Sequence, residues 1–587
     1  MTAEAHHRRG IRFTERERFA AAAREFRAAL QMESDEPRLW NDLGLVLWQG
    51  GDRQEAIQCL ERAVRLAPED PDAGGHLLTL YVLAGRNRKA LREAERLAEL
   101  LPGDADALAV LGKLRRMMWD LGGSLDALRQ AVRIVPREAQ CWMELAWTQS
   151  MVGDVAQTVA CCQKAVRLGA GPVSESMLLR WMCFSPDISP EYVAQRHREW
   201  GKRLYVVRAG KAPRGRSRPK KLRVGYVSGL FEAHSPNLLP VVEHHDRQRF
   251  EIYCFSDKPV SERVRWKLEA NCRELVDTRE LDNRQMAVAV AKRRIDILVD
   301  CDGHLLGAPR LPVFAMTRGT IRAAFSLYPN TTGLPAMDYQ IVDGWTAPSG
   351  AERLHTEALV RLPVFHCCRP VSQKPVVNPL PALQRGYVTF GSFSMALKIH
   401  EGVVELWSRL LRAIPRSRLL LHHFYGAING MSSPAVADRI HLMFERHGVE
   451  PARVGVVGSR WNDRHRKQYH YVDIALDPFP YSGCRTTYTA LWMGVPVVTL
   501  PGSSMASRVS ASMLASVDLK NWIASEPDEY VEIAASAASD FKKLARLRAG
   551  LRDRLARSPA SDERAYVSAL EDSYETMWKE KCGCPRE

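Results

Sequence analysis

The chain has 587 residues, of which 46% are hydrophobic and 26% charged, a composition typical of a soluble protein with several domains. The formal charge of +15 favours acidic partners, but the basic residues are spread without interleaved aromatics, so we expect no nucleic-acid platform. No apolar run reaches the ~18 residues of a membrane span. Because the start, Met1–Arg18, is polar and has no signal-peptide core, we expect a cytoplasmic protein.

The first part of the chain repeats. Pro68, Pro102 and Pro136 are spaced 34 residues apart, and each closes a pattern that fits two helices. The unit that ends at Pro68 shows an Ala-large-Ala stripe in its second helix, at Ala56, Leu60 and Ala63. The pattern resembles tetratricopeptide repeats, whose helix pairs stack into an α-solenoid with a concave face. We expect the array 1–175 to bind a peptide or protein; a spacer or a dimerisation element are the alternatives.

After the repeats, residues 176–220 are predicted to form a helical linker that ends in a basic stretch, 208–220. Short apolar runs then alternate with helical stretches, which predicts parallel, doubly wound sheets. The expected strands are 222–228, 251–256, 295–300, 387–391, 418–422, 454–457, 474–477 and 497–500. We expect two Rossmann-like lobes, 221–382 and 383–587, the second with a closing C-terminal helix. A ligand would lie at the carboxyl ends of the strands, as in the two-lobed GT-B glycosyltransferase layout.

One loop of the second predicted lobe has the features of an anion site. A strand ends at Asp477, a loop with Gly483 follows, and Thr486 and Thr487 open a helix. A helix N-terminus offers free N–H groups and a partial positive charge, to which two hydroxyls add donors. Helix capping alone would explain one threonine. Two threonines beside a glycine favour a diphosphate.

Five segments in order along the chain resemble motifs of the O-GlcNAc transferase family, which includes plant-type protein O-fucosyltransferases and bacterial members. They are Val227–Ser235, Ile297–His304, Leu327–Tyr339, Phe390–Ile399 and Asp477–Gly502. The resemblance covers roughly residues 178–580, and repeats precede this region in the family as well.

The resemblance implies transfer of a sugar from a nucleoside diphosphate to Ser or Thr of a protein, with inversion at the anomeric carbon and without a metal. The nucleotide sugar is then a co-substrate and not a cofactor, and the family's standard donor is UDP-GlcNAc. The 13 cysteines form no paired CxxC motif of zinc-ligand spacing, so we expect no metal site. Protein groups must then supply the positive field that stabilises the leaving diphosphate.

The same motifs assign roles to single residues. Lys398 matches the family's active-site lysine and His234 its active-site histidine, which would act as general base or orient the acceptor hydroxyl. The implied donor-binding set is Lys398, His465, Gly483, Arg485, Thr486 and Thr487. A lone surface histidine explains His465 nearly as well. The implied acceptor side is His304, Tyr328, Pro329, Thr331 and Thr332.

Several positions depart from the family's motifs, and most of these lie on the donor side. Thr489 stands where an acidic residue normally binds the donor ribose, and a hydroxyl cannot accept two strong hydrogen bonds as a carboxylate does. Arg485 adds a charge that would grip the diphosphate or block a pocket. Met395, Asn330 and Leu230 replace an amide, a glycine and an aspartate. These changes point to another nucleotide sugar or to lost catalysis.

The first hypothesis is therefore a protein O-glycosyltransferase whose repeats recruit the acceptor. The alternative is a degenerate transferase that acts as a protein-binding scaffold. A nucleic-acid binder is the weakest hypothesis, because it rests on charge alone. Flagellin, or another abundant bacterial protein, is one candidate acceptor, and a dimer is one candidate oligomeric state.

Overall fold

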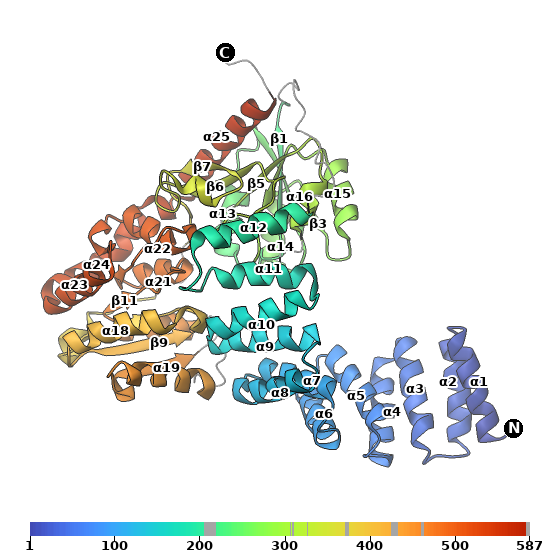
Figure 1. Ribbon diagram of the computed structural model, residues 1–587. Coiled ribbons are helices and arrows are strands. Elements are labelled where there is room, and N and C mark those ends of the chain that lie inside the picture. The colour runs from blue at the N-terminus through green and yellow to red at the C-terminus, as the bar shows by residue number, and fades with distance from the viewer. Residues whose placement is uncertain are drawn as a thin grey trace. The chain divides into compact units, whose positions relative to one another are not determined.

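The computed structural model describes residues 1–204, 219–305, 307, 310–325, 327–369, 375–423, 433–458 and 463–582 (Figure 1). Two compact units make up the chain, Met1–Thr148 and Gln149–Glu587. Of the predicted basic linker, residues 208–218 lie outside the described ranges. Among the described helices, none is long and apolar enough to cross a membrane.

The first unit consists of antiparallel helix pairs, as the 34-residue period predicts. Most of the later helices begin after an aspartate whose side chain accepts from a backbone N–H of the first turn, as Asp52, Asp104 and Asp120 do. The helices are α1 (Ala3–Glu15), α2 (Phe19–Leu30), α3 (Pro37–Gln49), α4 (Arg53–Leu66), α5 (Pro71–Leu83), α6 (Asn87–Leu100), α7 (Ala105–Met117), α8 (Leu121–Ile134) and the greater part of α9 (Ala139–Val152).

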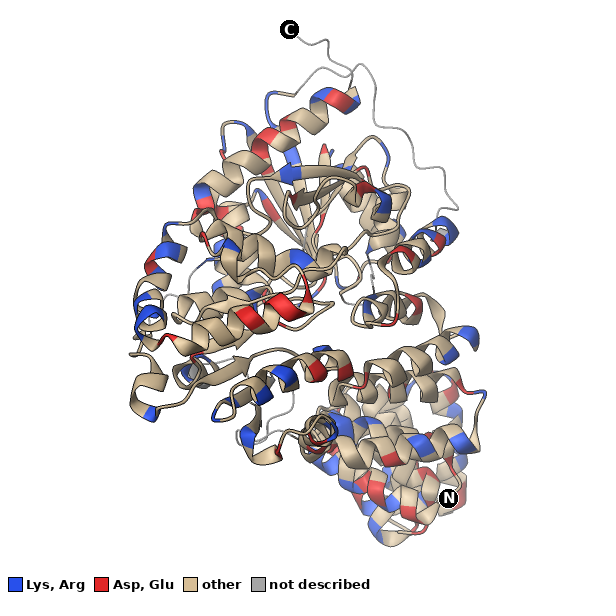
Figure 2. Cartoon of the chain, turned by 60° about the vertical axis from the view of Figure 1, so that its left-hand side comes forward, with Lys and Arg blue, Asp and Glu red and all other residues tan. Residues whose placement is uncertain are grey.

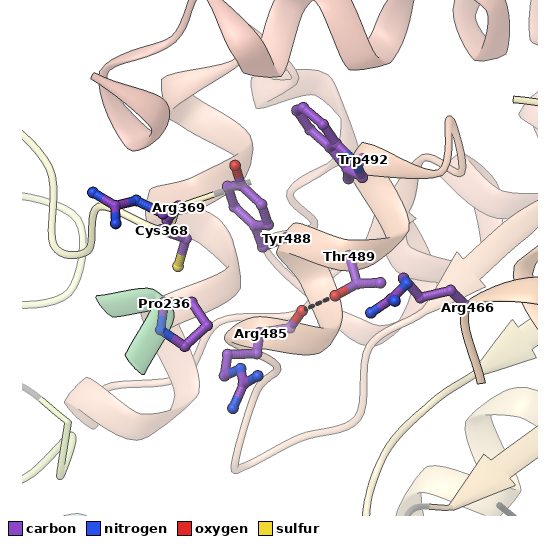
Figure 3. Close-up of a pocket in the computed structure, with 8 residues that line it drawn as sticks. All are labelled: Pro236, Cys368, Arg369, Arg466, Arg485, Tyr488, Thr489 and Trp492. Atoms are coloured by element: carbon purple, nitrogen blue, oxygen red, sulfur yellow. Dashed lines mark hydrogen bonds between the residues drawn. The ribbon is translucent and has the colours of Figure 1, made fainter. Parts of the chain in front are cut away.

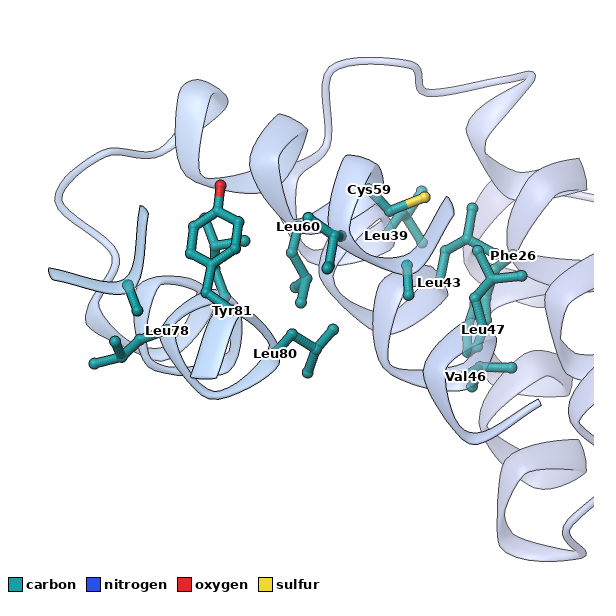
Figure 4. Packing of buried hydrophobic residues seen from close by; sticks show 14 of the residues in the cluster. Phe26, Leu39, Leu43, Val46, Leu47, Cys59, Leu60, Leu78, Leu80 and Tyr81 are labelled. Carbon is teal, nitrogen blue, oxygen red and sulfur yellow. The ribbon is translucent and has the colours of Figure 1, made fainter. Parts of the chain in front are cut away.

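The core of this unit runs from one helix pair to the next (Figure 4). Ala56, Leu60 and Ala63 of the predicted stripe are fully buried. A Cβ atom on Gly112 would lie 2.5 Å from Leu128 Cγ, so the glycine permits α7 and α8 to pack closely. Because each pair buries its apolar face only against its neighbours, the pairs stabilise one another as a stack.

The second unit begins with α10 (Val155–Arg167), α11 (Gly171–Met182) and α12 (Pro190–Leu204), which we call the helical segment. A seven-stranded, all-parallel sheet follows, in the order β3-β2-β1-β4-β5-β6-β7. Its strands are β1 (Leu222–Ser228), β2 (Phe250–Ser256), β3 (Glu274–Asp277), β4 (Ile297–Asp300), β5 (Ile321–Ala324), β6 (Tyr339–Asp343) and β7 (Ala358–Leu362). Its helices are α13 (Ser235–His244), α14 (Glu262–Asn271), α15 (Asn283–Lys292) and α16 (Leu311–Met316).

A second parallel sheet has five strands in the order β10-β9-β8-β11-β12. These strands are β8 (Thr389–Ser392), β9 (Arg418–His423), β10 (Val454–Gly458), β11 (Ile474–Leu476) and β12 (Val497–Val498). The helices of this part are α17 (Pro381–Arg385), α18 (Glu401–Ala413), α19 (Pro434–Arg446), α20 (Asp463–Gln468), α21 (Arg485–Trp492), α22 (Met505–Ser516), α23 (Pro527–Ser539) and α24 (Phe541–Ala556). Single 3-10 turns are η1 (Ala351–Leu354), η2 (Ala396–Lys398), η3 (Pro451–Arg453), η4 (Tyr469–Tyr471), η5 (Lys520–Trp522) and η6 (Pro559–Ser561).

The last helix, α25 (Glu563–Cys582), returns to the first sheet. Tyr574 Oη lies 3.1 Å from Tyr226 Oη of β1, and Glu571 Oε1 lies 2.9 Å from His245 Nδ1. The chain therefore connects the regions of the two sheets twice, once before β8 and once through α25. The predicted combination of a helical repeat array with parallel α/β sheets is confirmed.

The charges do not gather on one basic face in the view of Figure 2, where acidic and basic residues alternate along the helices. Many of them pair on the surface of the repeats, such as Arg27 with Glu55 at 2.6 Å and Lys89 with Glu61 at 2.7 Å. This distribution agrees with the expectation from sequence that the basic residues are spread along the chain.

Candidate functional site

A hydrogen bond joins the loop that follows β1 to the start of α21 in the other sheet region. His234 follows β1 and precedes α13, and Arg485 is the first residue of α21 in the other sheet region. Arg485 Nη1 donates to the carbonyl oxygen of Ala233 at 2.7 Å. The predicted histidine and the predicted donor loop therefore lie side by side.

Lys398 ends η2, directly after β8, and its side chain is half-buried. The Nζ atom donates to the carbonyl oxygen of Ser482 at 2.7 Å and lies 4.5 Å from the centre of the Tyr481 ring. Burial lowers the pKa of Lys398 to about 8, although the nearby Asp477 carboxylate acts in the opposite direction. At neutral pH the ammonium is still mostly protonated, and it lies against the loop that precedes α21.

His234 is half-buried, and its Nδ1 atom has no hydrogen-bond partner within the described part of the chain. Burial lowers its pKa to about 4, and the positive charges of Arg485 and Arg180 add to this effect. The imidazole is therefore neutral at physiological pH and is able to accept a proton or a hydrogen bond.

The donor loop is held by Asp477 at the end of β11. Asp477 Oδ1 accepts from the Gly483 N–H at 2.7 Å, and Oδ2 accepts from Thr499 Oγ1 at 2.7 Å. A Cβ on Gly483 would lie 2.7 Å from Thr486 Oγ1 and would also overlap Thr487 Oγ1. Only a glycine allows both hydroxyls to approach this turn.

The two threonines do not play the same part. Thr487 is buried and its hydroxyl lies 2.7 Å from Ser510 Oγ. Thr486 is half-exposed and lines a small hollow at the start of α21, together with Ser392 at the end of β8 and Phe393 and Ser394 after it. This hollow is where the N-terminus of α21 can meet an anion.

His465 lies behind this hollow. Its ring is buried, its Nδ1 lies 3.1 Å from His422 Nδ1, and it packs edge-on against Phe393 with ring centres 5.5 Å apart. Burial lowers the pKa of His465. The alternative of a lone surface histidine is therefore wrong, because the side chain is part of an aromatic cluster beside the donor loop.

The predicted acceptor-side residues are buried contacts of the helical segment. His304 lies 2.7 Å from Ser176 Oγ of α11 through Nδ1, and Tyr328 Oη lies 2.8 Å from His197 Nε2 of α12. Thr331 Oγ1 donates to Glu357 Oε2 at 2.7 Å, and Thr332 donates to the same carboxylate from its backbone and its hydroxyl. Pro329 is buried as well. An acceptor role of these residues stays a prediction, and what the geometry gives them is the docking of α11 and α12.

A glycine pair makes this docking possible. Gly333 has φ +73°, and a Cβ there would overlap the backbone of His197, while a Cβ on Gly201 would overlap the Gly333 carbonyl. On the other side, Gly153, at φ +98°, brings the α9–α10 turn to the Ala396 carbonyl of η2, where a Cβ would lie 2.6 Å away. The helical segment therefore contacts loops of both sheet regions.

A pocket lies along the side of α21 that carries Arg485, Tyr488, Thr489 and Trp492 (Figure 3). It is lined by Pro236, Cys368, Arg369, Arg466, Arg485, Tyr488, Thr489 and Trp492. Thr489, which stands where the family has an acid, donates its hydroxyl to the Arg485 carbonyl at 2.7 Å. None of the eight lining residues is acidic, so the absence of the carboxylate noted in the sequence is not compensated within this pocket.

The sequence did not indicate two residues of the helical segment that reach the site. Phe184, just beyond the end of α11, stacks on Tyr481 with ring centres 4.3 Å apart and planes 5° from parallel, and Arg180 lies in the last turn of α11. No motif marks either residue. The sequence indicated only that helices precede the first sheet, and it did not indicate that residues of this region reach the site.

The family model of glycosyl transferase family 41 matches residues 207–367 and 380–570. The chain belongs to glycosyl transferase family 41. Two tetratricopeptide-repeat models match residues 7–71 and 47–114, so the predicted repeats are confirmed.

The curated relatives of this family 41 chain include plant proteins described as probable UDP-N-acetylglucosamine–peptide N-acetylglucosaminyltransferase SPINDLY. The Petunia hybrida protein is 34% identical over 405 residues, which are 67% of this chain and 43% of the relative. The protein from Hordeum vulgare is 35% identical over 417 residues, 68% of this chain and 43% of the relative. The chain thus spans less than half the length of these relatives.

Among solved structures, a mutant form of Thermobaculum terrenum O-GlcNAc transferase is similar over most of both chains. The TM-score is 0.79 at 32% identity, and the match covers 87% of this chain and 98% of the bacterial one. The similarity therefore includes both the repeats and the two-sheet region of family 41.

Proposed function

We propose that this chain is an inverting, metal-independent protein O-glycosyltransferase, which moves a sugar from a nucleoside diphosphate to Ser or Thr of a protein acceptor. One observation carries the proposal. The Lys398 ammonium is hydrogen-bonded to the loop that opens α21, and Arg485 at the start of α21 is bonded to the residue before His234. A cation, a helix N-terminus and a neutral histidine thus converge at the carboxyl ends of two parallel sheets.

The chemistry requires negative charge to develop on the leaving diphosphate as the bond from the anomeric carbon to the phosphate oxygen breaks. Lys398, Arg485 and the N–H groups of α21 would stabilise this charge, and Thr486 would donate from its half-exposed hydroxyl. Groups held by Asp477 and by the Gly483 turn need little rearrangement during the reaction. His465 would support the donor side through the aromatic cluster around Phe393.

The acceptor hydroxyl would attack the opposite face of the sugar, since inversion requires entry from the side away from the diphosphate. His234 is neutral and has an unoccupied Nδ1 atom, so it is the group able to orient this hydroxyl and take its proton. The two catalytic residues of the proposal are therefore Lys398 and His234.

UDP-GlcNAc is the first donor to test, because the names of the plant relatives and of the Caenorhabditis elegans relative specify UDP-N-acetylglucosamine. Thr489, whose hydroxyl is engaged by the Arg485 carbonyl, makes other nucleotide sugars the second choice. The tetratricopeptide repeats would recruit the acceptor protein in the cytoplasm, and flagellin is one candidate. A dimer is the oligomeric state to test first.

The same departure at Thr489 favours a second candidate function, a protein-binding scaffold without catalysis. An assay of nucleoside diphosphate release with a panel of nucleotide sugars separates the two. The transferase releases nucleoside diphosphate from at least one donor, and the release depends on Lys398. A scaffold releases it from none.

A further inference from the structure

Helix α11 brings an arginine to the site from outside the residues matched by the family model. Arg180 Nη1 donates to the Leu305 carbonyl at 3.0 Å, in the turn that follows β4. Strand β4 pairs in parallel with β1, the strand that His234 follows. Since the carboxyl ends of neighbouring parallel strands lie at one edge of the sheet, Arg180 is fixed at the same edge as His234.

The Tyr481 ring is contacted both by Lys398 and by the chain just after α11. Phe184 follows Arg180 by four residues and lies just beyond the end of α11 at Met182. Its ring stacks on Tyr481 with ring centres 4.3 Å apart. The Lys398 ammonium lies 4.5 Å from the centre of the same Tyr481 ring. Tyr481 is therefore contacted both by Phe184, just after α11, and by Lys398 of η2, and Arg180 lies four residues before Phe184.

The charge of Arg180 acts on both catalytic candidates. It lowers the pKa of Lys398 and the pKa of His234, although burial is the larger cause for each. Arg180 is half-buried and forms no ion pair with any residue of the described ranges. Arg180 and Lys398 repel each other, and the Asp477 carboxylate offsets this repulsion only at Lys398. A bound anion between the two cations would reduce the repulsion further.

We propose that Arg180 contacts the diphosphate of the donor, as a cation that the helical segment supplies in addition to Lys398. This role rests on the proposed function. It adds to the donor site one side chain that comes from α11. In the transfer step the bond between the anomeric carbon and the phosphate oxygen breaks with its electron pair on the diphosphate. A bond to the acceptor oxygen forms, and the acceptor proton leaves to His234. Arg180 exchanges no proton and only stabilises the charge on the leaving group.

The test compares Arg180→Met, Arg180→Lys and the control Arg203→Met. Arg203 is an exposed arginine of α12 in the same helical segment, paired with Glu175 at 2.8 Å, so its loss removes one charge without touching the site. The measurements are the dissociation constants of UDP and GDP by calorimetry, the rate of donor turnover, and thermal unfolding of each variant.

We expect Arg180→Met to weaken nucleotide binding about 10- to 100-fold, the range for loss of one charge-assisted hydrogen bond. Arg180→Lys should recover most of this loss, because it retains the charge, and Arg203→Met should bind as the wild type does. A purely structural Arg180 would instead lower the unfolding temperature and leave the nucleotide affinity of the folded protein unchanged.

Two results would overturn the inference, and they are distinguishable. In the first, the wild type binds nucleotide tightly, and Arg180→Met changes neither the affinity nor the turnover. This result excludes Arg180 as a diphosphate contact but does not contradict the proposed function. Wild-type protein that binds neither UDP nor GDP and releases no nucleoside diphosphate from any nucleotide sugar contradicts the proposed function, and the role of Arg180 with it.

Discussion

Arg485 Nη1 donates a 2.7 Å hydrogen bond to the carbonyl oxygen of Ala233, the residue before His234. This bond joins the start of α21 in the second sheet region to the histidine loop of the first. The Arg485 side chain therefore reaches toward the histidine loop, and its role toward the diphosphate stays a prediction.

Arg485→Met should lower donor turnover about 10-fold or more, because it removes both the bond to the histidine loop and a cation beside the diphosphate. Arg485→Lys keeps the positive charge but loses the planar guanidinium with its several N–H donors, so we expect an intermediate rate. Steady-state kinetics of nucleoside diphosphate release provide the measurement. An unchanged kcat/KM in Arg485→Met would show that this contact has no part in the reaction.

Lys398→Ala should reduce turnover about 10²- to 10³-fold, as expected for the loss of one group that stabilises the charge of the transition state. The fold should persist, since the only hydrogen bond described for Nζ is the one to the Ser482 carbonyl. Lys520→Ala, at an exposed lysine of η5, is the matched control and should behave as the wild type does. Near-normal turnover in Lys398→Ala would contradict the site assignment.

The pH dependence of kcat/KM should be bell-shaped. The acid limb reflects His234, whose pKa is lowered to about 4, because its protonated form cannot accept the proton of the acceptor. The alkaline limb reflects Lys398, whose pKa is lowered to about 8, because turnover falls as the ammonium loses its proton. Lys398→Arg should abolish the limb near pH 8, since arginine stays charged. If the fall in kcat/KM near pH 8 persists in Lys398→Arg, the group that titrates there is not Lys398.

Gly483→Ala should weaken nucleotide binding about 10-fold, because the added Cβ would lie 2.7 Å from Thr486 Oγ1 and displace the hydroxyls of the donor loop. Gly550→Ala in α24 is the control, since nothing lies within 4 Å of a Cβ there. Calorimetric titration with UDP measures the difference. Equal affinities in the two variants would mean that the turn does not position a diphosphate.

In the repeats, Gly112→Ala should destabilise the first unit by about 1 kcal/mol or more, because a Cβ at 2.5 Å from Leu128 Cγ forces α7 and α8 apart. Gly75→Ala in α5 meets nothing within 4 Å and should stabilise by up to about 1 kcal/mol through helix propensity. Scanning calorimetry should therefore give shifts of opposite sign. Shifts of the same sign would contradict the packing described for α7 and α8.

Much of the fold was predictable because its signals are local. The 34-residue period gave the helix pairs, and the apolar runs predicted β1 and β9 to within one residue at either end. Strands β3, β5, β6 and β7 were not predicted. Length does not explain this, because β8, β10, β11 and β12 are no longer and were predicted. β3 and β7 have exposed positions and charged residues, so their sequences lack the continuous apolar run of a buried strand.

The site was predictable only where a motif marks it. Lys398, His234 and the Gly483 turn lie near one another, as the ordered motifs suggested. Burial of His304 and Tyr328 was not predictable, because it depends on the docking of α11 and α12 over loops more than a hundred residues away in sequence. The position of Arg180 was not predictable for the same reason, since its hydrogen-bond partner, the Leu305 carbonyl, is 125 residues away in sequence.

The most direct test of the central claim is intact-mass spectrometry of cellular proteins incubated with this chain and a nucleotide sugar, beginning with UDP-GlcNAc. The proposed function predicts that at least one protein gains the mass of one or more sugar residues on Ser or Thr. The gain should accompany release of nucleoside diphosphate and disappear with Lys398→Ala. If no nucleotide sugar gives a mass shift or released nucleotide, the transferase function is contradicted and the protein-binding scaffold is the remaining candidate.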